Sequence, residues 1–218
     1  MENNPVYGQF VELMGIVPSK VTNITEIPFL PVELFKSHKV LAGSGTVSRI
    51  FESSSTTGIG NSHHHIHDLN FCRASFLNCF KHFYSSPEDY LFIALLPGYT
   101  ERMTSSLVFM IQSLIEVSGN KKDCLFTTDF DVLAHTLQKY NCTSQKLILI
   151  GVTWALTDFA ATHPMPLSDN IIVMETGGMK GRKKEITRTE VHQLLKKSFE
   201  KSQIHSEFGM TELQSAAY

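Results

Sequence analysis

The chain has 218 residues, of which 42% are hydrophobic and 18% are charged. This length is sufficient for a substantial buried core, and a formal net charge of -2 does not supply the basic surface that binds nucleic acids. No apolar run is long enough to span a bilayer, and the N-terminus lacks the basic and apolar segments of a signal peptide. We therefore expect a globular cytoplasmic protein with no nucleic-acid partner and no membrane span.

The first forty residues predict short helical pieces, because Pro18, Pro28 and Pro31 interrupt any longer helix. A strand is predicted next over 46–51. Apolar residues then recur at helical spacing over 67–84, which predicts a helix.

From residue 90 onward, strands and helices alternate along the chain. Tyr90 to Leu96 is a short apolar run that ends at Pro97-Gly98, as in a strand buried on both faces. Further strands are predicted over 124–127, 146–152 and 170–174, and further helices around 103–119, 132–140 and 187–199. The alternation predicts the α/β class, with a mostly parallel sheet flanked by helices in one domain over 1–218.

The last predicted helix has the clearest start signal. Thr187-Arg-Thr-Glu190 is a capping-box pattern. The apolar spacing predicts an inner face made of Val191, Leu194, Leu195 and Phe199.

The four cysteines do not form a C-x-x-C pair and lie in apolar or amphipathic stretches. We expect reduced core residues and no zinc site.

A run of small polar residues is the strongest local motif. It contains Ser53, Ser54, Ser55, Thr56, Thr57 and Gly58 and continues to Ser62. Backbone amides and hydroxyls of such a run can surround a phosphate, and a helix predicted directly after it could add its positive end. The Walker pattern is absent. A flexible Ser/Thr-rich loop without a ligand is the alternative interpretation.

Two weaker motifs lie later in the chain. In Ser206 to Glu212, an aromatic residue beside a glycine could cover a planar base, and Thr211 and Glu212 offer oxygen ligands for Mg²⁺. In Glu175 to Gly181, Gly177 and Gly178 follow a predicted strand, which is where open α/β sheets bind ligands. A capped turn and a plain strand-to-helix turn remain alternatives.

The histidine run from His63 to His67 allows two interpretations. His63 and His67 could share one helix face and bind a metal, but zinc requires further ligands that the sequence does not offer in a recognisable pattern. The run is otherwise predicted to begin the helix after the Ser/Thr/Gly loop, with His63 or His64 facing a phosphate or an acyl group.

The order and spacing of the three motifs resemble the adenylate-forming enzymes, and within them the acyl-protein synthetases of bacterial bioluminescence and the phenylacetate-CoA ligases. The resemblance covers nearly the whole chain. It implies part of the large domain of such an enzyme, with ATP and Mg²⁺ as cofactors, a carboxylic acid as substrate and a thiol of CoA or of a protein cysteine as acceptor.

The resemblance also assigns roles to residues. It implies catalytic roles for Thr56, Thr57 and Glu212, with Glu212 holding the Mg²⁺. It implies a nucleotide site made of Ser53, Ser54, Ser55, Thr56, Thr57, Gly58, Gly177, Gly178, Phe208, Gly209 and Thr211. Two positions depart from the family pattern: Ser55 replaces a glycine, and Phe208 replaces a tyrosine, which removes a phenolic hydrogen bond.

Family members continue beyond this region with a ribose-binding aspartate and a small domain that carries a catalytic lysine. The chain ends six residues after Glu212. We therefore expect an N-terminal core portion that binds ATP·Mg²⁺ weakly and does not turn over alone. A non-catalytic nucleotide- or acyl-binding module is the alternative, and the absence of G-x-S-x-G argues against an α/β hydrolase.

Overall fold

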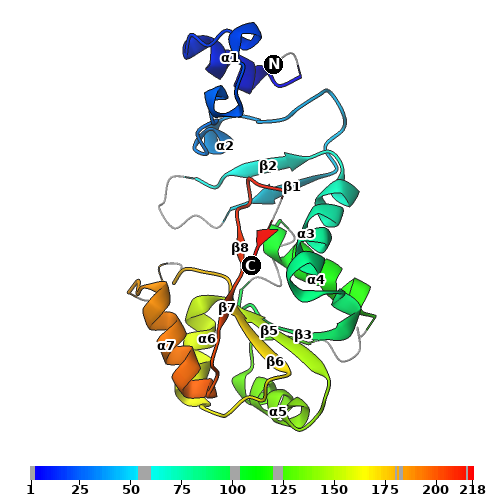
Figure 1. Ribbon diagram of the computed structural model, residues 1–218, viewed down its shortest axis with the longest axis vertical. Coiled ribbons are helices and arrows are strands. Elements are labelled where there is room, and N and C mark those ends of the chain that lie inside the picture. Colours follow the sequence, from blue (N-terminus) through cyan, green and yellow to red (C-terminus); the bar gives the residue numbers. More distant parts are fainter. Residues whose placement is uncertain are drawn as a thin grey trace.

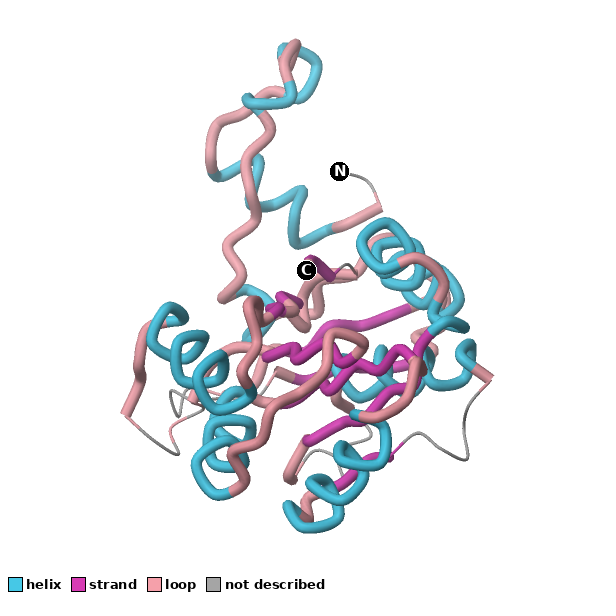
Figure 2. The backbone as a smooth tube through the Cα atoms, turned by 60° about the horizontal axis from the view of Figure 1, so that its bottom comes forward, coloured by secondary structure: helices cyan, strands magenta, loops and turns pink. Residues whose placement is uncertain are grey.

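The computed structural model describes residues 3–53, 60–98, 104–119, 125–179, 181, 184–214 and 216–218. Its centre is a parallel five-stranded sheet in the order β4-β3-β5-β6-β7, with helices on both sides of the strands (Figures 1 and 2). The strands are β3 (Tyr90–Leu95), β4 (Leu125–Thr127), β5 (Lys146–Gly151), β6 (Ile171–Glu175) and β7 (His205–Ser206). The predicted α/β class with a mostly parallel sheet is confirmed.

The central strands follow from their apolar runs. All six residues of β3 are buried, and in β5 only Lys146 is exposed. Ile93 of β3 pairs with Leu149 of β5, and both side chains are fully buried. A strand with two apolar faces must be covered on both sides, which the flanking helices achieve.

The helices form two groups. On one side, α3 (Leu69–Tyr84) packs against α4 (Ser106–Ser118), where the rings of Phe76 and Phe109 are 5.9 Å apart. The other group is α5 (Phe130–Asn141), α6 (Thr153–Thr162) and α7 (Arg188–Phe199), and the ring of Phe159 in α6 contacts Phe130 and Phe199. These helices connect successive parallel strands.

Several helix ends match their sequence signals. Helix α4 stops at Gly119, which adopts a left-handed conformation with φ of 71°. Helix α7 has the predicted capping box of Thr187 and Glu190. Its inner face consists of Val191, Leu195 and Phe199, whereas the prediction for Leu194 is wrong, because that side chain is 36% exposed.

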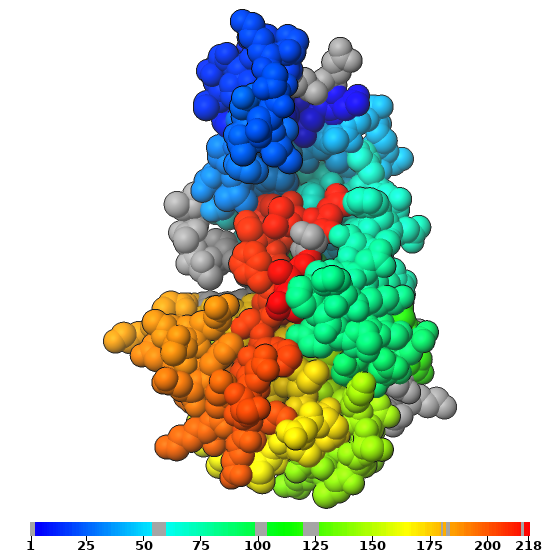
Figure 3. All heavy atoms as spheres, viewed as in Figure 1, coloured from blue at the N-terminus to red at the C-terminus, as the bar shows by residue number. Residues whose placement is uncertain are grey.

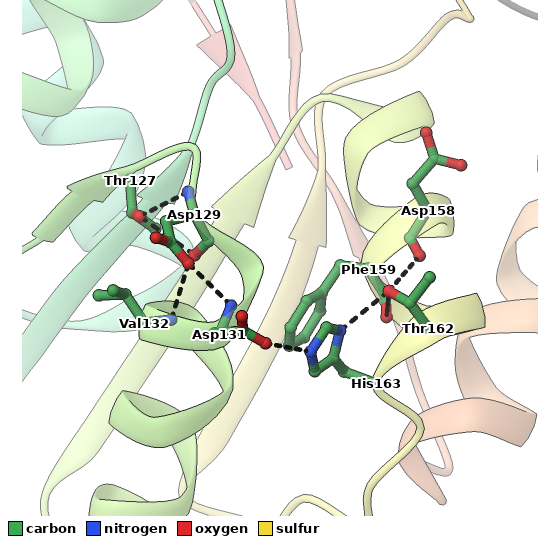
Figure 4. A network of polar contacts seen from close by, with 8 residues as sticks. All are labelled: Thr127, Asp129, Asp131, Val132, Asp158, Phe159, Thr162 and His163. Atoms are coloured by element: carbon green, nitrogen blue, oxygen red, sulfur yellow. Dashed lines mark hydrogen bonds and ion pairs between the residues drawn. The ribbon is translucent and has the colours of Figure 1, made fainter.

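Helices α5 and α6 meet at a polar network (Figure 4). Asp129 caps α5 by accepting hydrogen bonds from the amides of Asp131 and Val132. The side chain of Asp131 reaches His163, just after α6, at 3.0 Å. The ring of His163 stacks on Phe159.

The N-terminal residues form an arm that projects from the sheet (Figures 1 and 3). As predicted, it consists of short pieces: α1 (Pro5–Leu13), two 3-10 turns (Pro18–Lys20 and Ile24–Glu26) and α2 (Leu34–Ser37). A third 3-10 turn (Pro87–Asp89) precedes β3. Among the described helices, none is long and apolar enough to cross a membrane.

A hairpin of β1 (Arg49–Glu52) and β2 (His63–Ile66) follows the arm. The prediction that the Ser/Thr/Gly loop leads directly into a helix is wrong, because the histidine run is strand β2. Burial alternates along β2, with His64 and Ile66 buried, so the run has the period of a strand. Helix α3 begins only at Leu69, after the cap Asp68.

Two short strands, β8 (Phe208–Gly209) and β9 (Ala216–Ala217), pair near the described C-terminal end. This C-terminal segment lies between the hairpin and the central sheet (Figures 1 and 3).

Candidate functional site

The order of the strands makes the carboxyl ends of the parallel strands, here called the carboxyl edge, the candidate binding edge of the sheet. The chain adds β4 on one side of β3 and then β5 on the other, so the direction of winding reverses between β3 and β5. In open parallel sheets, ligands bind beyond the carboxyl ends of the strands near such a reversal.

A cavity of about 370 Å³ lies at this edge. Its polar lining comes from segments that follow the strands: Ser53 after β1, Thr104 on the approach to α4, Thr176 after β6 and Glu207 after β7. Its apolar lining comes mainly from α3, α4 and β1. Those residues include Phe51, Cys72, Phe76, Phe109 and Met110.

The apolar wall is rigidly packed. The ring of Phe109 lies 5.4 Å from that of Phe51 and 5.9 Å from that of Phe76. Phe51 and Phe76 are almost fully buried. Burial raises the pKa of the Cys72 thiol, so Cys72 contributes a neutral apolar surface.

The fold brings together residues from all three predicted motifs. Ser53, Thr176, Gly209 and Thr211 line the same cavity, although more than 150 positions separate Ser53 from Gly209 and Thr211. Ser53 also holds the base of its loop, since its hydroxyl accepts a hydrogen bond from the amide of Ser62 at 2.8 Å. Ser54, Ser55, Thr56, Thr57 and Gly58 lie outside the described residues.

Other predicted residues lie elsewhere. Gly177 and Gly178 line a separate cavity of about 110 Å³ next to Glu175 and Thr153. Phe208 is 62% exposed. Neither Phe208 nor Glu212 is among the described residues that line the larger cavity.

Thr211 is held by the hairpin. The Nδ1 atom of His64 lies 2.7 Å from the carbonyl oxygen of Thr211, and the ring of Phe35 in α2 packs edge-on against that of His64 at 5.6 Å. Burial lowers the pKa of His64, which favours the neutral ring whose Nδ1–H donates to the carbonyl. The arm and the hairpin thus position a residue of the candidate site.

Glu175 is a central residue at this edge that the motif analysis did not single out. One carboxylate oxygen accepts hydrogen bonds from the Thr153 hydroxyl at 2.6 Å and the Gly177 amide at 2.8 Å. The other accepts from the Ser206 hydroxyl at 2.6 Å. Burial acts to raise the pKa of Glu175, but these hydrogen bonds outweigh it, so the pKa lies below its ordinary value.

The charge of Glu175 therefore connects the start of α6, the loop after β6 and the end of β7. The only sequence signal for this role was an acidic residue at the end of an apolar strand, directly before a glycine pair.

Glu207 is a second residue that the sequence did not reveal. It is buried and lines the larger cavity. A Cβ atom at Gly209 would lie 2.7 Å from its Oε1 atom, so the glycine leaves the space that this carboxylate occupies.

No group of three or more His, Cys, Asp or Glu residues suited to a metal is present within the described parts of the chain. Glu52, which lines the larger cavity, accepts a hydrogen bond from Thr104 at 3.4 Å and lies 3.6 Å from the Nε2 atom of His63. Mg²⁺ bound with a nucleotide usually takes one or two carboxylates together with phosphates and water, and Glu52 and Glu207 are the carboxylates in the described lining of this cavity.

Comparison with known protein-family models gives no match, and comparison with curated protein sequences gives none either. The motifs and the geometry of the site are therefore the grounds for a function.

Proposed function

We propose that this chain is the core of an enzyme that uses ATP to activate a carboxylic acid. In this reaction the carboxylate attacks the α-phosphorus of ATP, an acyl-adenylate forms and pyrophosphate leaves. A thiol of CoA or of a protein cysteine then attacks the acyl carbon and releases AMP. Catalysis would depend on positioning and on charge stabilisation by hydrogen-bond donors and Mg²⁺.

One observation supports this proposal above the others. One cavity at the carboxyl edge of a parallel sheet is lined by Ser53, which belongs to the first motif, and by Gly209 and Thr211, which belong to the last motif. The same cavity has an apolar wall of aromatic side chains, which suits the hydrocarbon part of an acid. Hydroxyl groups and an apolar wall in one cavity match a substrate with a polar and an apolar end.

A second candidate function is the binding of a nucleotide or acyl group without turnover. The position of Glu212 favours it, since this residue is not among the described residues lining the cavity. If Glu212 does not hold the metal, the cavity could bind a nucleotide without the Mg²⁺ that adenylation requires.

A direct assay distinguishes the two functions. The 218-residue chain is titrated with ATP and Mg²⁺, and carboxylate-dependent exchange of pyrophosphate into ATP is measured with a panel of acids. Exchange supports adenylation, and nucleotide binding without exchange supports the binding module. Failure to bind ATP, AMP or a non-hydrolysable acyl-adenylate analogue contradicts both.

Variants locate the activity in this cavity. Thr211→Val removes the hydroxyl but keeps the backbone carbonyl that His64 contacts, and we expect it to weaken nucleotide binding. Glu212→Gln keeps the shape and removes the charge. If Glu212 holds Mg²⁺, exchange should fall about a hundredfold, the scale of one lost electrostatic contact in a transition state. Ser144→Ala, at an exposed and remote serine, is the control.

A further inference from the structure

A second cavity lies on the other side of the C-terminal segment. Its volume is about 660 Å³, and its walls are the end of α3, one face of α7 and the chain from 203 to 206, together with Tyr218. Ser206 and Tyr218 line it, whereas Glu207 and Ala216 line the candidate site. Neighbouring residues of extended chain face opposite sides, so one segment separates the two cavities. Figures 1 and 3 show the chain after α7 running over this face between α7 and α3.

The wall formed by α7 is basic. Arg188, His192 and Lys196 all line the cavity, and residues four apart lie on one helix face. Arg188 and Lys196 are about 12 Å apart along the helix axis, and their long side chains can converge on a ligand beside His192. No Asp or Glu is among the described residues that line this cavity.

The orientation of His192 is fixed by the edge of the sheet. Its Nε2 atom lies 3.1 Å from the Ser206 hydroxyl and 3.5 Å from Oε1 of Glu175. Because Ser206 donates its proton to Glu175, its oxygen accepts the hydrogen bond from Nε2–H of His192. This leaves Nδ1 of His192, to which no residue in the described part of the chain hydrogen-bonds.

The opposite wall is aromatic. The ring of Tyr218 lies 5.2 Å from that of Tyr84 and 5.9 Å from that of Phe83, whose side chain is 54% exposed. The Tyr84 hydroxyl lies 2.8 Å from Nδ1 of His205. Burial raises the pKa of Tyr84 to about 12, so its hydroxyl keeps a proton to donate, and His205 then carries its own proton on Nε2.

We propose that this second cavity binds a small organic phosphate that carries an aromatic ring. Arg188 and Lys196 match the double negative charge of a phosphate monoester, and Arg188 can donate two hydrogen bonds to it. The ring packs against the exposed face of Phe83 and against Tyr218. The inference is independent of adenylation, because no residue that lines the cavity of the candidate site takes part in it.

Phenyl phosphate is the probe for a test with the intact 218-residue chain. Its binding is followed by titration calorimetry and by the NMR signals of the histidine rings. We expect the signals of His192 and His205 to shift, and the affinity to fall at least tenfold in the Arg188→Gln/Lys196→Gln variant. Lys197→Gln is the matched control, since Lys197 is the next residue of α7, is exposed and does not line the cavity.

Two further variants test whether the aromatic ring contributes to binding and whether phenyl phosphate binds in the second cavity. Phe83→Ala should weaken binding of phenyl phosphate but not of inorganic phosphate, which has no ring. Thr211→Val should leave binding of phenyl phosphate unchanged, because Thr211 lines the cavity of the candidate site and not the second cavity. The single variant Lys196→Gln replaces the double variant if the latter does not fold. Equal affinities of Lys196→Gln and Lys197→Gln, or unchanged ring signals of His192 and His205 when phenyl phosphate binds, would overturn the proposal.

Discussion

The ring of His64 and the backbone carbonyl of Thr211 form a hydrogen bond of 2.7 Å between residues that lie 147 positions apart in the chain. This bond connects the N-terminal hairpin to the segment of the last motif. The environment of His64 keeps its pKa below the ordinary value of 6.5, chiefly through burial. Burial therefore opposes protonation of the ring in the folded chain, whereas the hydrogen bond to Thr211 favours the charged ring, which keeps its Nδ1–H.

Replacing His64 with alanine should lower the free energy of unfolding. The Thr211 carbonyl loses its donor, and a buried unsatisfied group typically costs about 1–3 kcal/mol. His63 is its neighbour on the more exposed face of β2, with a side chain 44% exposed, so His63→Ala should have a much smaller effect. Urea denaturation at pH 7.5 measures both variants. Equal losses would show that the contact with Thr211 contributes little.

Stability should also fall as the pH drops below 6.5. The unfolded chain takes up protons on its histidines in this range, while His64, His65 and His205 resist protonation in the fold, chiefly because of burial. The stabilisation that comes from these neutral histidines is therefore complete above pH 6.5, and it is lost as the pH falls toward their lower folded-state pKa values. Urea midpoints at pH 7.5 and 5.5 test this, and the His64→Ala variant should show a smaller difference between them. An unchanged difference would exclude His64 as a source.

Glu175→Gln should destabilise the carboxyl edge of the sheet. The variant loses the charge that accepts hydrogen bonds from Thr153, Ser206 and the Gly177 amide. Hydrogen bonds to a charged group contribute about 1.5–3 kcal/mol each, so a loss of about 2–3 kcal/mol is expected after partial rearrangement. Glu200→Gln, at an exposed carboxylate just after α7, is the control for urea unfolding.

The contribution of Glu175 should have its own dependence on pH. Its folded-state pKa lies below the ordinary value of 4.5, so its contribution is complete above pH 4.5 and is lost as the pH falls through the lower value. Acid titration of wild type and Glu175→Gln should converge at low pH. Parallel curves would contradict an ionised Glu175.

Gly151→Ala should destabilise the centre of the fold. An added Cβ would lie 2.8 Å from Cγ of Leu156 and 3.1 Å from the backbone oxygen of Leu95, both of which are fully buried residues. Overpacking of this kind typically costs about 1–3 kcal/mol. In Gly209→Ala, the added Cβ meets only the end of the Glu207 side chain. The thermal unfolding of this variant should therefore change less, while its affinity for the proposed nucleotide falls. A larger stability loss in Gly209→Ala than in Gly151→Ala would contradict this reasoning.

The network in Figure 4 contains both a helix cap, at Asp129, and a surface contact, between Asp131 and His163, and their contributions to stability should differ. Asp129→Ala removes the acceptor for two amides of α5 and should cost about 1 kcal/mol, the usual value for a lost N-cap. Asp131→Ala removes the contact with His163, but the Asp131 side chain is 95% exposed, so solvent screens the pair and the loss should be much smaller. Thermal melts of the two variants give the comparison, and the reverse order would refute it.

The sequence by itself determined the class of the fold and most of its elements. A short apolar run that ends at Pro-Gly, such as Tyr90–Leu96, favours a strand covered on both faces, and the capping box at Thr187 fixes the start of α7 locally. Helix α6 was missed because it is buried on several sides, so no polar stripe reveals the helical period. The histidine run was assigned to a helix because polar residues carry no hydrophobic period, and only pairing with β1 makes it a strand.

Only the tertiary structure shows which residues form the candidate site. Motif spacing suggested that Ser53, Gly177 and Thr211 share one cleft, but the fold places Ser53 and Thr211 around one cavity and Gly177 beside another. The contacts of His64 with Thr211 and of Glu175 with Ser206 join residues far apart in the chain. Such contacts depend on strand order and on the path of the chain across the sheet edge. Local sequence patterns record the conformation of each segment, but they do not record which distant segments meet.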